Sequence, residues 1–260
     1  MNLEAPCVPR TAGTSRQERE RNARPLFRCE WLDVVFLHYE VDPAVLAPLV
    51  PFTLDTWEGK AYVSLVAFTL AGLSCAHGRR ATRAMLRPIS DHAFLNVRTY
   101  VRQGDASGIY FLAEWLSKRV PVPLGRPLFG LPYRYGRFSR ARDVQSGVVS
   151  GTVMGKRGDL RFHATHAPDP VYASCAAGSL DEFLLERYTA FTHWAGLRRY
   201  FRVWHPPWPV TPLAATVHDA SLLDETGVWH HHAHLVSAHH SHGIHNVGMG
   251  FPHFGVPLRG

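Results

Sequence analysis

Near the middle of the chain, a stretch that alternates between apolar and polar positions and an aromatic-rich stretch after it together predict a β-hairpin. From Leu95 to Val101 the odd positions are apolar or β-branched and the even positions are polar or aromatic, which is the pattern of a half-buried strand. A polar turn follows at Gln103–Ser107. Gly108–Leu116 is then rich in Ile, Tyr, Phe and Trp, which favour strands.

The register of this hairpin decides which side chains share a face. Directly opposed residues of an antiparallel pair point to the same side of a sheet, and we expect Arg102 to lie opposite Gly108. A slip of one residue would move every side chain of the second strand to the other face. In the expected register one face carries Asn96, Arg98, Tyr100, Tyr110 and Glu114.

This polar face is our candidate site. Arg98 can clamp a substrate carboxylate through two parallel hydrogen bonds, and Glu114 can work as an acid or a base. Asn96, Tyr100 and Tyr110 would shape the ligand-binding pocket. The alternative is structural, since Arg98 and Glu114 could simply pair with each other across the hairpin.

Strand patterns dominate the rest of the chain. Val34–Val41 alternates, and Ala61–Leu70 is predicted as a mostly buried strand. Asp42 and Ser179 are candidate N-caps of short helices, and the Arg-rich residues 72–90 suggest a surface loop. Because turns come at intervals typical of antiparallel barrels or sandwiches, we predict a mainly β fold with a few short helices.

Composition favours a globular protein with a sizeable core, since 46% of the 260 residues are hydrophobic and 19% are charged. Residues 1–25 are charged and poor in apolar side chains, so we expect a flexible N-terminal arm followed by a single domain at 26–260. The four cysteines form no CxxC pair, and neither a secretory signal nor a long apolar run is found. We therefore expect a cytoplasmic protein with reduced thiols and no membrane association.

The formal net charge of +7 suits an anionic ligand. The Arg residues are scattered, and no compact Lys/Arg run interleaved with aromatic residues occurs, so we expect no nucleic-acid partner. The chain has no Gly-rich phosphate-binding loop after a strand, and we expect no cofactor. Formation of a homo-oligomer stays open.

The histidines of the C-terminal segment are the second candidate site. In a strand, His230, His232 and His234 would share one face, and neutral imidazoles suit zinc, copper or nickel. No HExxH helix accompanies them, so we assign no specific metal site. These three histidines are kept as the candidate ligands of an alternative, metal-binding function.

Several segments carry a family resemblance: WLDVVFLHYEVDP, LVPFTLDTWEGKAYVSLVAF, FLNVRTYV, GIYFLAEWLSK, GLPYR and FLLERY. From Trp31 onward the chain resembles the YqjF-like family of uncharacterised bacterial proteins, which is similar in fold to acetoacetate decarboxylase. The resemblance implies an antiparallel barrel or cone around a small-molecule cavity. Acetoacetate decarboxylase uses a lysine that forms a Schiff base. Lys118, followed by Arg119, is a partial match and the candidate nucleophile if the second strand extends to it.

We therefore expect a cavity protein that binds or transforms a small anionic organic molecule. If it is an enzyme, the expected activity is decarboxylase- or lyase-like and acts on a small carboxylic or keto acid. Arg98 would be the anion clamp, Glu114 the acid or base, and Lys118 the nucleophile. Two alternatives remain open: a non-catalytic small-ligand-binding or regulatory module, and a metal-binding protein that uses the C-terminal histidines.

Overall fold

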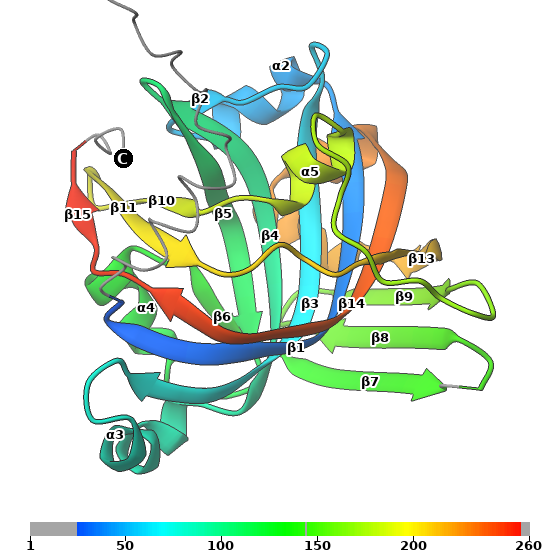
Figure 1. Cartoon of the computed structure of the whole chain (residues 1–260). Coiled ribbons are helices and arrows are strands. Elements are labelled where there is room, and N and C mark those ends of the chain that lie inside the picture. Colours follow the sequence, from blue (N-terminus) through cyan, green and yellow to red (C-terminus); the bar gives the residue numbers. More distant parts are fainter. Residues whose placement is uncertain (1–24, 144, 256–260) are drawn as a thin grey trace, which may run out of the picture.

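A computed structural model describes residues 25–143 and 145–255 (Figure 1), which leaves all but one residue of the predicted N-terminal arm outside the described part. Within these ranges the strands form an 11-stranded sheet and a four-stranded sheet. In the same ranges, every helix is too short or too polar to cross a bilayer. The prediction of a mainly β fold is confirmed.

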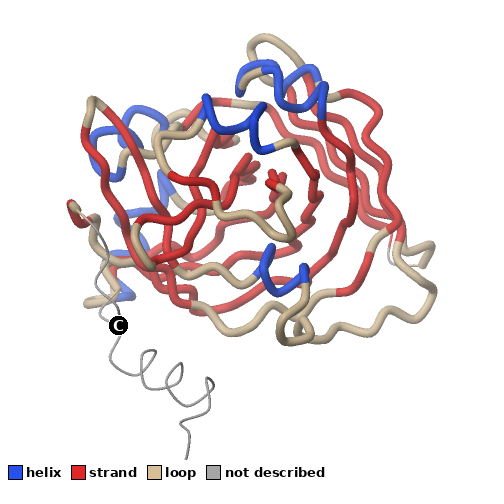
Figure 2. Tube along the Cα trace, turned by 90° about the horizontal axis from the view of Figure 1, so that it is seen from above, coloured by secondary structure: helices blue, strands red, loops and turns tan. Residues whose placement is uncertain are grey.

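The main sheet bends until its two ends meet. Its strands, in spatial order, are β12 (Thr211–Pro212), β14 (Ala233–Met249), β1 (Phe27–Val41), β3 (Ala61–Cys75), β4 (His92–Gln103), β5 (Ala106–Leu116), β10 (Thr189–Trp194), β11 (Leu197–Trp204) and β15 (His253–Phe254), with β2 (Thr53–Leu54) beside β4 and β6 (Tyr133–Tyr135) beside β5. Because β11 also pairs with β14, the strands from β14 to β11 close into a ring (Figure 2).

The ring is not wholly antiparallel, which corrects the expected architecture. Strand β5 pairs in parallel with β6 on one part of its edge and with β10 on another. Parallel neighbours need a crossover connection, and the chain supplies one through α4 (Val122–Phe129) and another through α5 (Leu180–Leu185). The Pro- and Gly-rich segment before β6 thus forms a helix that covers one end of the ring (Figure 1).

The second sheet packs against the outside of the ring. It contains β7 (Arg137–Asp143), β8 (Val148–Met154), β9 (Asp159–Thr165) and β13 (Ala214–Asp219). Burial alternates residue by residue along β8 and β9, so one face of this sheet is buried and the other faces solvent.

The remaining helices are short. They are α2 (Pro43–Leu46), α3 (Arg79–Leu86) and the 3-10 helices η1 (Ala47–Leu49), η2 (Arg87–Ile89), η3 (Ser221–Thr226) and η4 (Val228–His232). Both predicted N-caps are present, since Asp42 accepts a hydrogen bond from the backbone of Ala44 and Ser179 from that of Glu182. The prediction of a loop over residues 72–90 is wrong, because β3 runs to Cys75 and α3 and η2 follow.

Apolar side chains gather in two cores, one on each face of the ring strands. The inner core receives side chains from all the strands of the ring, including Phe36, Phe68, Phe111, Phe201 and Val247. The outer core lies between the ring and the second sheet. A given side chain therefore belongs to one core or the other according to which way it points from its strand.

The predicted register of the central hairpin is wrong by one residue at the turn, because Arg102 lies opposite Ser107 and not Gly108, and a bulge compensates for this shift farther along. Asn96 lies opposite Glu114 as predicted, but Arg98 lies opposite Phe111, so Leu112 is an extra residue on β5. Leu112 and its neighbour Ala113 both pack in the outer core. The alternation along β5 therefore reverses at the bulge.

Asp55, just after β2, is a buried carboxylate that holds two arginines. Its side chain accepts hydrogen bonds from Arg102 at 2.7 Å and from Arg187 at 2.8 Å, and only 4% of the residue is exposed. Arg187 follows α5 and also donates to the backbone carbonyl of Phe183. The pair therefore fixes the segment after α5 to the ring.

We expect Asp55→Ala to lower the free energy of unfolding by about 3 kcal/mol, because it leaves the buried Arg187 guanidinium without its counter-charge. Urea unfolding measures this loss. The matched control is Lys60→Gln, which breaks the Lys60–Glu40 pair, where the lysine side chain is 54% exposed. The control should lose less than about 1 kcal/mol, and equal losses in both variants would contradict the assigned role of Asp55.

Candidate functional site

The inner core contains a cavity of about 180 Å³. Its walls come from β1, β3, β4, β5 and β11, and α4 covers one side. Most of the lining is apolar or aromatic, and the aromatic members are Phe27, Trp31, Phe68, Phe94, Phe111, Phe129, Tyr133, Phe201 and Trp208. Such a lining with few polar groups is the usual form of a small-molecule site.

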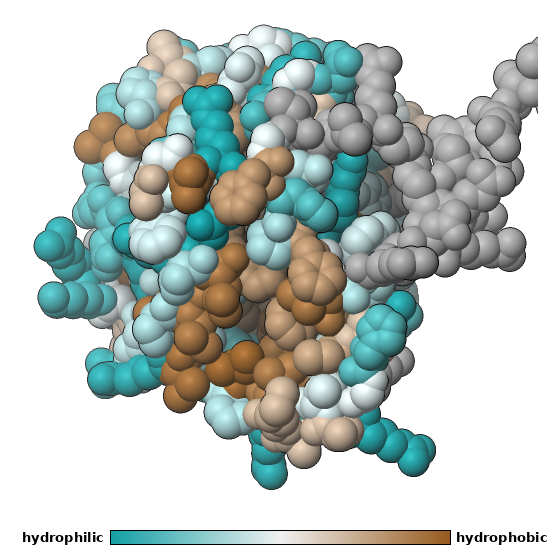
Figure 3. Space-filling model, turned by 90° about the vertical axis from the view of Figure 1, so that its left-hand side faces the viewer, coloured by the Kyte–Doolittle hydropathy of each residue, from teal (hydrophilic) through white to brown (hydrophobic). Residues whose placement is uncertain are grey.

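The cavity reaches the surface beside α4. Leu124 and Leu128 line it and are nevertheless 41% and 55% exposed. Figure 3 views the molecule from the side on which α4 lies and shows apolar residues around a hollow. A ligand could therefore enter between apolar side chains and meet polar groups deeper in the ring.

Four buried polar side chains of the hairpin line this cavity: His92, Asn96 and Arg98 from β4, and Glu114 from β5. At most 9% of each residue is exposed. Asn96 Oδ1, Arg98 Nε and Glu114 Oε2 make no hydrogen bond within the described part of the protein. Because buried polar atoms are nearly always hydrogen-bonded in folded proteins, three such atoms in one cavity indicate a binding site.

Burial favours the neutral form of the Glu114 carboxyl, because it raises the pKa well above the ordinary value of 4.5. A neutral carboxyl both donates and accepts a hydrogen bond. Glu114 therefore keeps its proton, and can present it to the cavity, up to a higher pH than an exposed glutamate.

Two other groups that line the cavity have raised pKa values. Burial, together with the negative charge that Glu114 carries once it ionises, raises the pKa of Tyr133 well above its usual range. Burial raises the pKa of the Cys29 thiol to about 12. Cys29 is consequently a poor nucleophile, since the thiolate is the reactive form.

Arg98 supplies the positive charge of the cavity. Its Nη2 donates to the backbone carbonyl of Leu184 at 3.3 Å, and its guanidinium lies 6.0 Å from the ring of Phe36. Within residues 25–143 and 145–255 no carboxylate forms an ion pair with it, so the alternative of an Arg98–Glu114 pair is wrong. Arg187, which also lines the cavity, is paired with Asp55.

The two predicted tyrosines take different places. Tyr100 points to the inner-core side, but its hydroxyl donates to the carbonyl of Leu184 at 2.8 Å and the residue does not line the cavity. Tyr110 packs against the outer core beside Phe52. Its predicted place on the polar face is wrong, because the bulge at Leu112 turns it to the other side of the sheet.

Lys118 does not join the polar group, because β5 ends at Leu116. Its Nζ donates to the backbone carbonyls of Ser90 at 2.5 Å and Arg87 at 3.2 Å. The chain has two other lysines, Lys60 and Lys156, and no lysine lines the cavity.

The C-terminal histidines do not share one strand face. His230 and His232 belong to η4, and only His234 lies in β14. His232 and His234 line a separate polar pocket with Glu40 and Lys60. His230 instead contacts Asp224. The predicted grouping is wrong because the segment begins as a 3-10 helix, which directs alternate side chains differently from a strand.

Sequence reasoning missed several residues that line the cavity, notably His92, Tyr133 and Trp208. Tyr133 reaches the site because β6 pairs in parallel with β5 opposite Glu114. The only signal for it was its place in the GLPYR segment. His205 also lines the cavity, where it stacks on Tyr188.

A family model described as an uncharacterized conserved protein, DUF2071, matches residues 28–245. The protein YqjF of Bacillus subtilis (strain 168) is 31% identical over 211 residues, which cover 78% of this chain and 82% of YqjF. Both matches include the hairpin that carries Asn96, Arg98 and Glu114, since they span most of the chain.

Solved structures share the fold at low sequence identity. An acetoacetate decarboxylase-like enzyme from Sphingomonas wittichii RW1 superposes with a TM-score of 0.61 at 18% identity and covers 90% of this chain and 95% of its own. Acetoacetate decarboxylase from Legionella pneumophila gives 0.62 at 14% identity, covering 90% and 88%. The enduracididine biosynthesis enzyme MppR, complexed with pyruvate, gives 0.62 at 14% identity, covering 89% and 91%. The likeness establishes an acetoacetate decarboxylase-like fold.

The raised pKa of Glu114 predicts a pH-dependent stability that Glu114→Gln removes. In the folded protein the carboxyl keeps its proton, whereas in the unfolded chain it releases it above pH 4.5. Wild-type stability therefore falls as the pH rises from about 4.5 until the buried carboxyl itself ionises. The variant has no such loss, so its stability relative to the wild type should increase across this window.

Urea unfolding at several pH values between about 5 and about 8 measures the difference. Parallel pH profiles for the wild type and Glu114→Gln would mean that the carboxyl is already ionised in the folded protein.

Proposed function

The chain belongs to the DUF2071 family of uncharacterized conserved proteins, so its function has to be inferred from its own cavity. We propose that the protein binds a small carboxylic acid in this cavity. The observation that carries this proposal is the set of buried atoms without a protein partner at Asn96, Arg98 and Glu114. A ligand with an apolar body and one carboxylate end would complement both the walls and this polar group.

Arg98 would hold the ligand carboxylate. A guanidinium in a buried site forms strong, charge-assisted hydrogen bonds with a carboxylate, and no carboxylate of the described residues competes for it. In its neutral form, which burial favours, Glu114 does not repel the anion. The aromatic side chains around both residues would contact the rest of the ligand.

Glu114 would also allow proton transfer. A protonated carboxyl can donate a hydrogen bond to a carbonyl oxygen of the ligand and can give up its proton where negative charge develops. This favours lyase-like chemistry on a keto acid, with Glu114 as the general acid. The pyruvate bound in MppR supports the ligand class, because the two proteins share a fold.

A second candidate function is a ligand-binding module without catalysis. Its support is the absence of a lysine from the cavity, which removes the nucleophile of a Schiff-base mechanism. Turnover distinguishes the two functions. A general acid at Glu114 requires that Glu114→Gln binds the ligand and fails to transform it, whereas a binding module transforms nothing in either form.

We expect Arg98→Met to weaken binding of small aromatic or branched carboxylic acids by at least about tenfold, because it removes the charge-assisted contact. Isothermal titration or ligand-observed NMR with a panel of such acids measures the change. The matched control is Arg137→Met, an exposed arginine of β7 that does not line the cavity.

Equal binding to the wild type and Arg98→Met would remove Arg98 as the anion clamp. Loss of binding in Arg137→Met as well would mean that the net positive charge attracts the acids, and not the cavity. Binding of the matching amides as tightly as the acids would likewise contradict the proposal.

We expect borohydride treatment with keto acids to trap no adduct on the folded protein, because no lysine amine lines the cavity. Intact-mass spectrometry followed by peptide mapping checks this. An adduct at Lys118 would show that its amine leaves the carbonyls of Arg87 and Ser90 and enters the site.

A further inference from the structure

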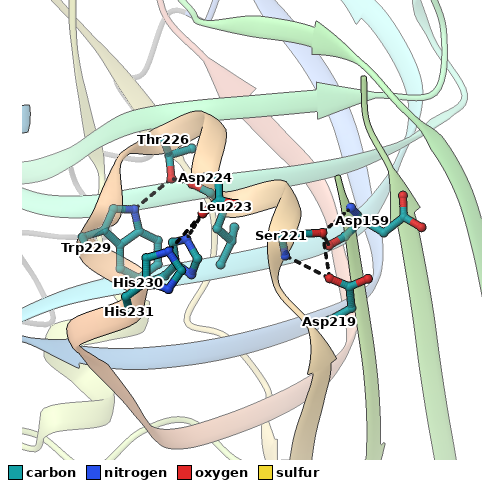
Figure 4. Close-up of polar contacts among 9 residues, drawn as sticks. All are labelled: Asp159, Asp219, Ser221, Leu223, Asp224, Thr226, Trp229, His230 and His231. Atoms are coloured by element: carbon teal, nitrogen blue, oxygen red, sulfur yellow. Dashed lines mark hydrogen bonds and ion pairs between the residues drawn. The ribbon is translucent and has the colours of Figure 1, made fainter. Parts of the chain in front are cut away.

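Three potential metal ligands converge at the turn between η3 and η4. His230 Nε2 lies 2.7 Å from Asp224 Oδ1, and His231 Nε2 lies 3.1 Å from the same oxygen (Figure 4). The two imidazole ring centres are 3.9 Å apart. Asp224 Oδ1 thus faces the Nε2 atoms of both neighbouring histidines.

The backbone around these residues is held in place by buried contacts. Trp229 directly precedes the two histidines and is fully buried. Its indole nitrogen donates to Thr226 Oγ1 at 2.8 Å. Thr226 in turn donates to the carbonyl of Leu223 at 2.7 Å. Gly227, with a φ of +108°, links the two short helices in a conformation that L residues rarely adopt.

The start of η3 is fixed to the second sheet. Ser221 Oγ donates to Asp219 Oδ1 at 2.8 Å and accepts from the backbone of Asp159 at 3.0 Å (Figure 4). Because this turn is anchored at both ends, the three ligand groups already lie together, and no flexible loop has to become ordered when an ion binds. Preorganisation of this kind lowers the entropic penalty of binding an ion.

We propose that Asp224, His230 and His231 form a binding site for a divalent transition-metal ion of the zinc class. Two imidazole nitrogens and one carboxylate oxygen are ligands that zinc accepts, and they leave a fourth position open. Ligand atoms of a tetrahedral zinc ion lie about 3.3 Å from one another, because each is about 2.0 Å from the ion. The three candidate atoms already lie within 4.8 Å of one another.

The exposure of the three side chains agrees with this assignment. The His230 side chain is only 7% exposed, whereas those of His231 and Asp224 are 59% and 55% exposed. The ion would be anchored on the protein side by His230 and remain open to solvent on the other.

The alternative is that both histidines only hydrogen-bond to Asp224. In that case each imidazole would carry its proton on Nε2, and each ring would have to move that proton to Nδ1 before Nε2 could bind a metal ion. A metal site and a hydrogen-bonded cluster therefore differ in affinity and stoichiometry, which can be measured.

Isothermal titration of the full chain, purified without a histidine tag and treated with chelator, with zinc chloride tests the site. We expect one equivalent of zinc to bind. His231→Ala and Asp224→Asn should each weaken binding by at least about tenfold, because each removes a ligand. Titration with cobalt(II) should give the visible absorption of a low-coordinate site in the wild type and lose it in both variants.

The control is His232→Ala, which removes an exposed histidine of the same helix η4 that is not part of the cluster. It should bind zinc as the wild type does. Since His231 and Asp224 are exposed, both ligand variants should keep the wild-type circular dichroism and melting temperature without metal.

Three results would overturn the proposal. The first is binding of several zinc ions that Asp224→Asn leaves unchanged, which is adventitious binding to surface histidines. The second is an equal loss of affinity in His232→Ala. The third is no measurable binding by a protein whose circular dichroism shows it to be folded.

Discussion

The bulge at Leu112 is the constraint on which the candidate site depends. Before the bulge, Ile109 and Phe111 point into the inner core, and after it Glu114 and Leu116 do so. A regular strand would place Phe111 and Glu114 on opposite faces, since successive side chains alternate. One extra residue therefore gives the cavity both an apolar wall and an ionisable group from the same strand.

Polar side chains on the inner face of the ring are costly to bury, so their presence there indicates a role. Closing β11 on β14 removes the central strands from solvent on their inner face, so every polar side chain there must find a partner in the protein or in a ligand. Asp55 and Arg187 meet this demand by pairing with each other. Arg98 meets it in part through the carbonyl of Leu184, whereas Arg98 Nε and Glu114 Oε2 have no partner among the described residues, and burial raises the pKa of Glu114.

A shared fold does not by itself give this chain the chemistry of its structural neighbours. The likeness to acetoacetate decarboxylases is one of backbone arrangement, and chemistry depends on which side chains the strands carry inward. In this chain the inward positions hold arginine, glutamate and asparagine among aromatic residues, while the lysine nearest the hairpin lies beyond the end of β5. These inward side chains are the basis of the proposed carboxylic-acid site.

Local patterns in the sequence determined much of this protein. Period-two alternation identified β4, aromatic and β-branched residues identified β5, and side-chain caps identified α2 and α5. The predicted pair of Asn96 with Glu114 is present only because the bulge compensates for a turn register that is wrong by one residue. Tertiary structure decided what local patterns do not encode. The bulge turned Tyr110 outward, the parallel crossover brought Tyr133 beside Glu114, and the turn at Gly227 brought Asp224 to His230 and His231. Each of these placements depends on packing between segments far apart in the chain or on a single unusual backbone angle, and neither leaves a periodic signal in the amino-acid sequence.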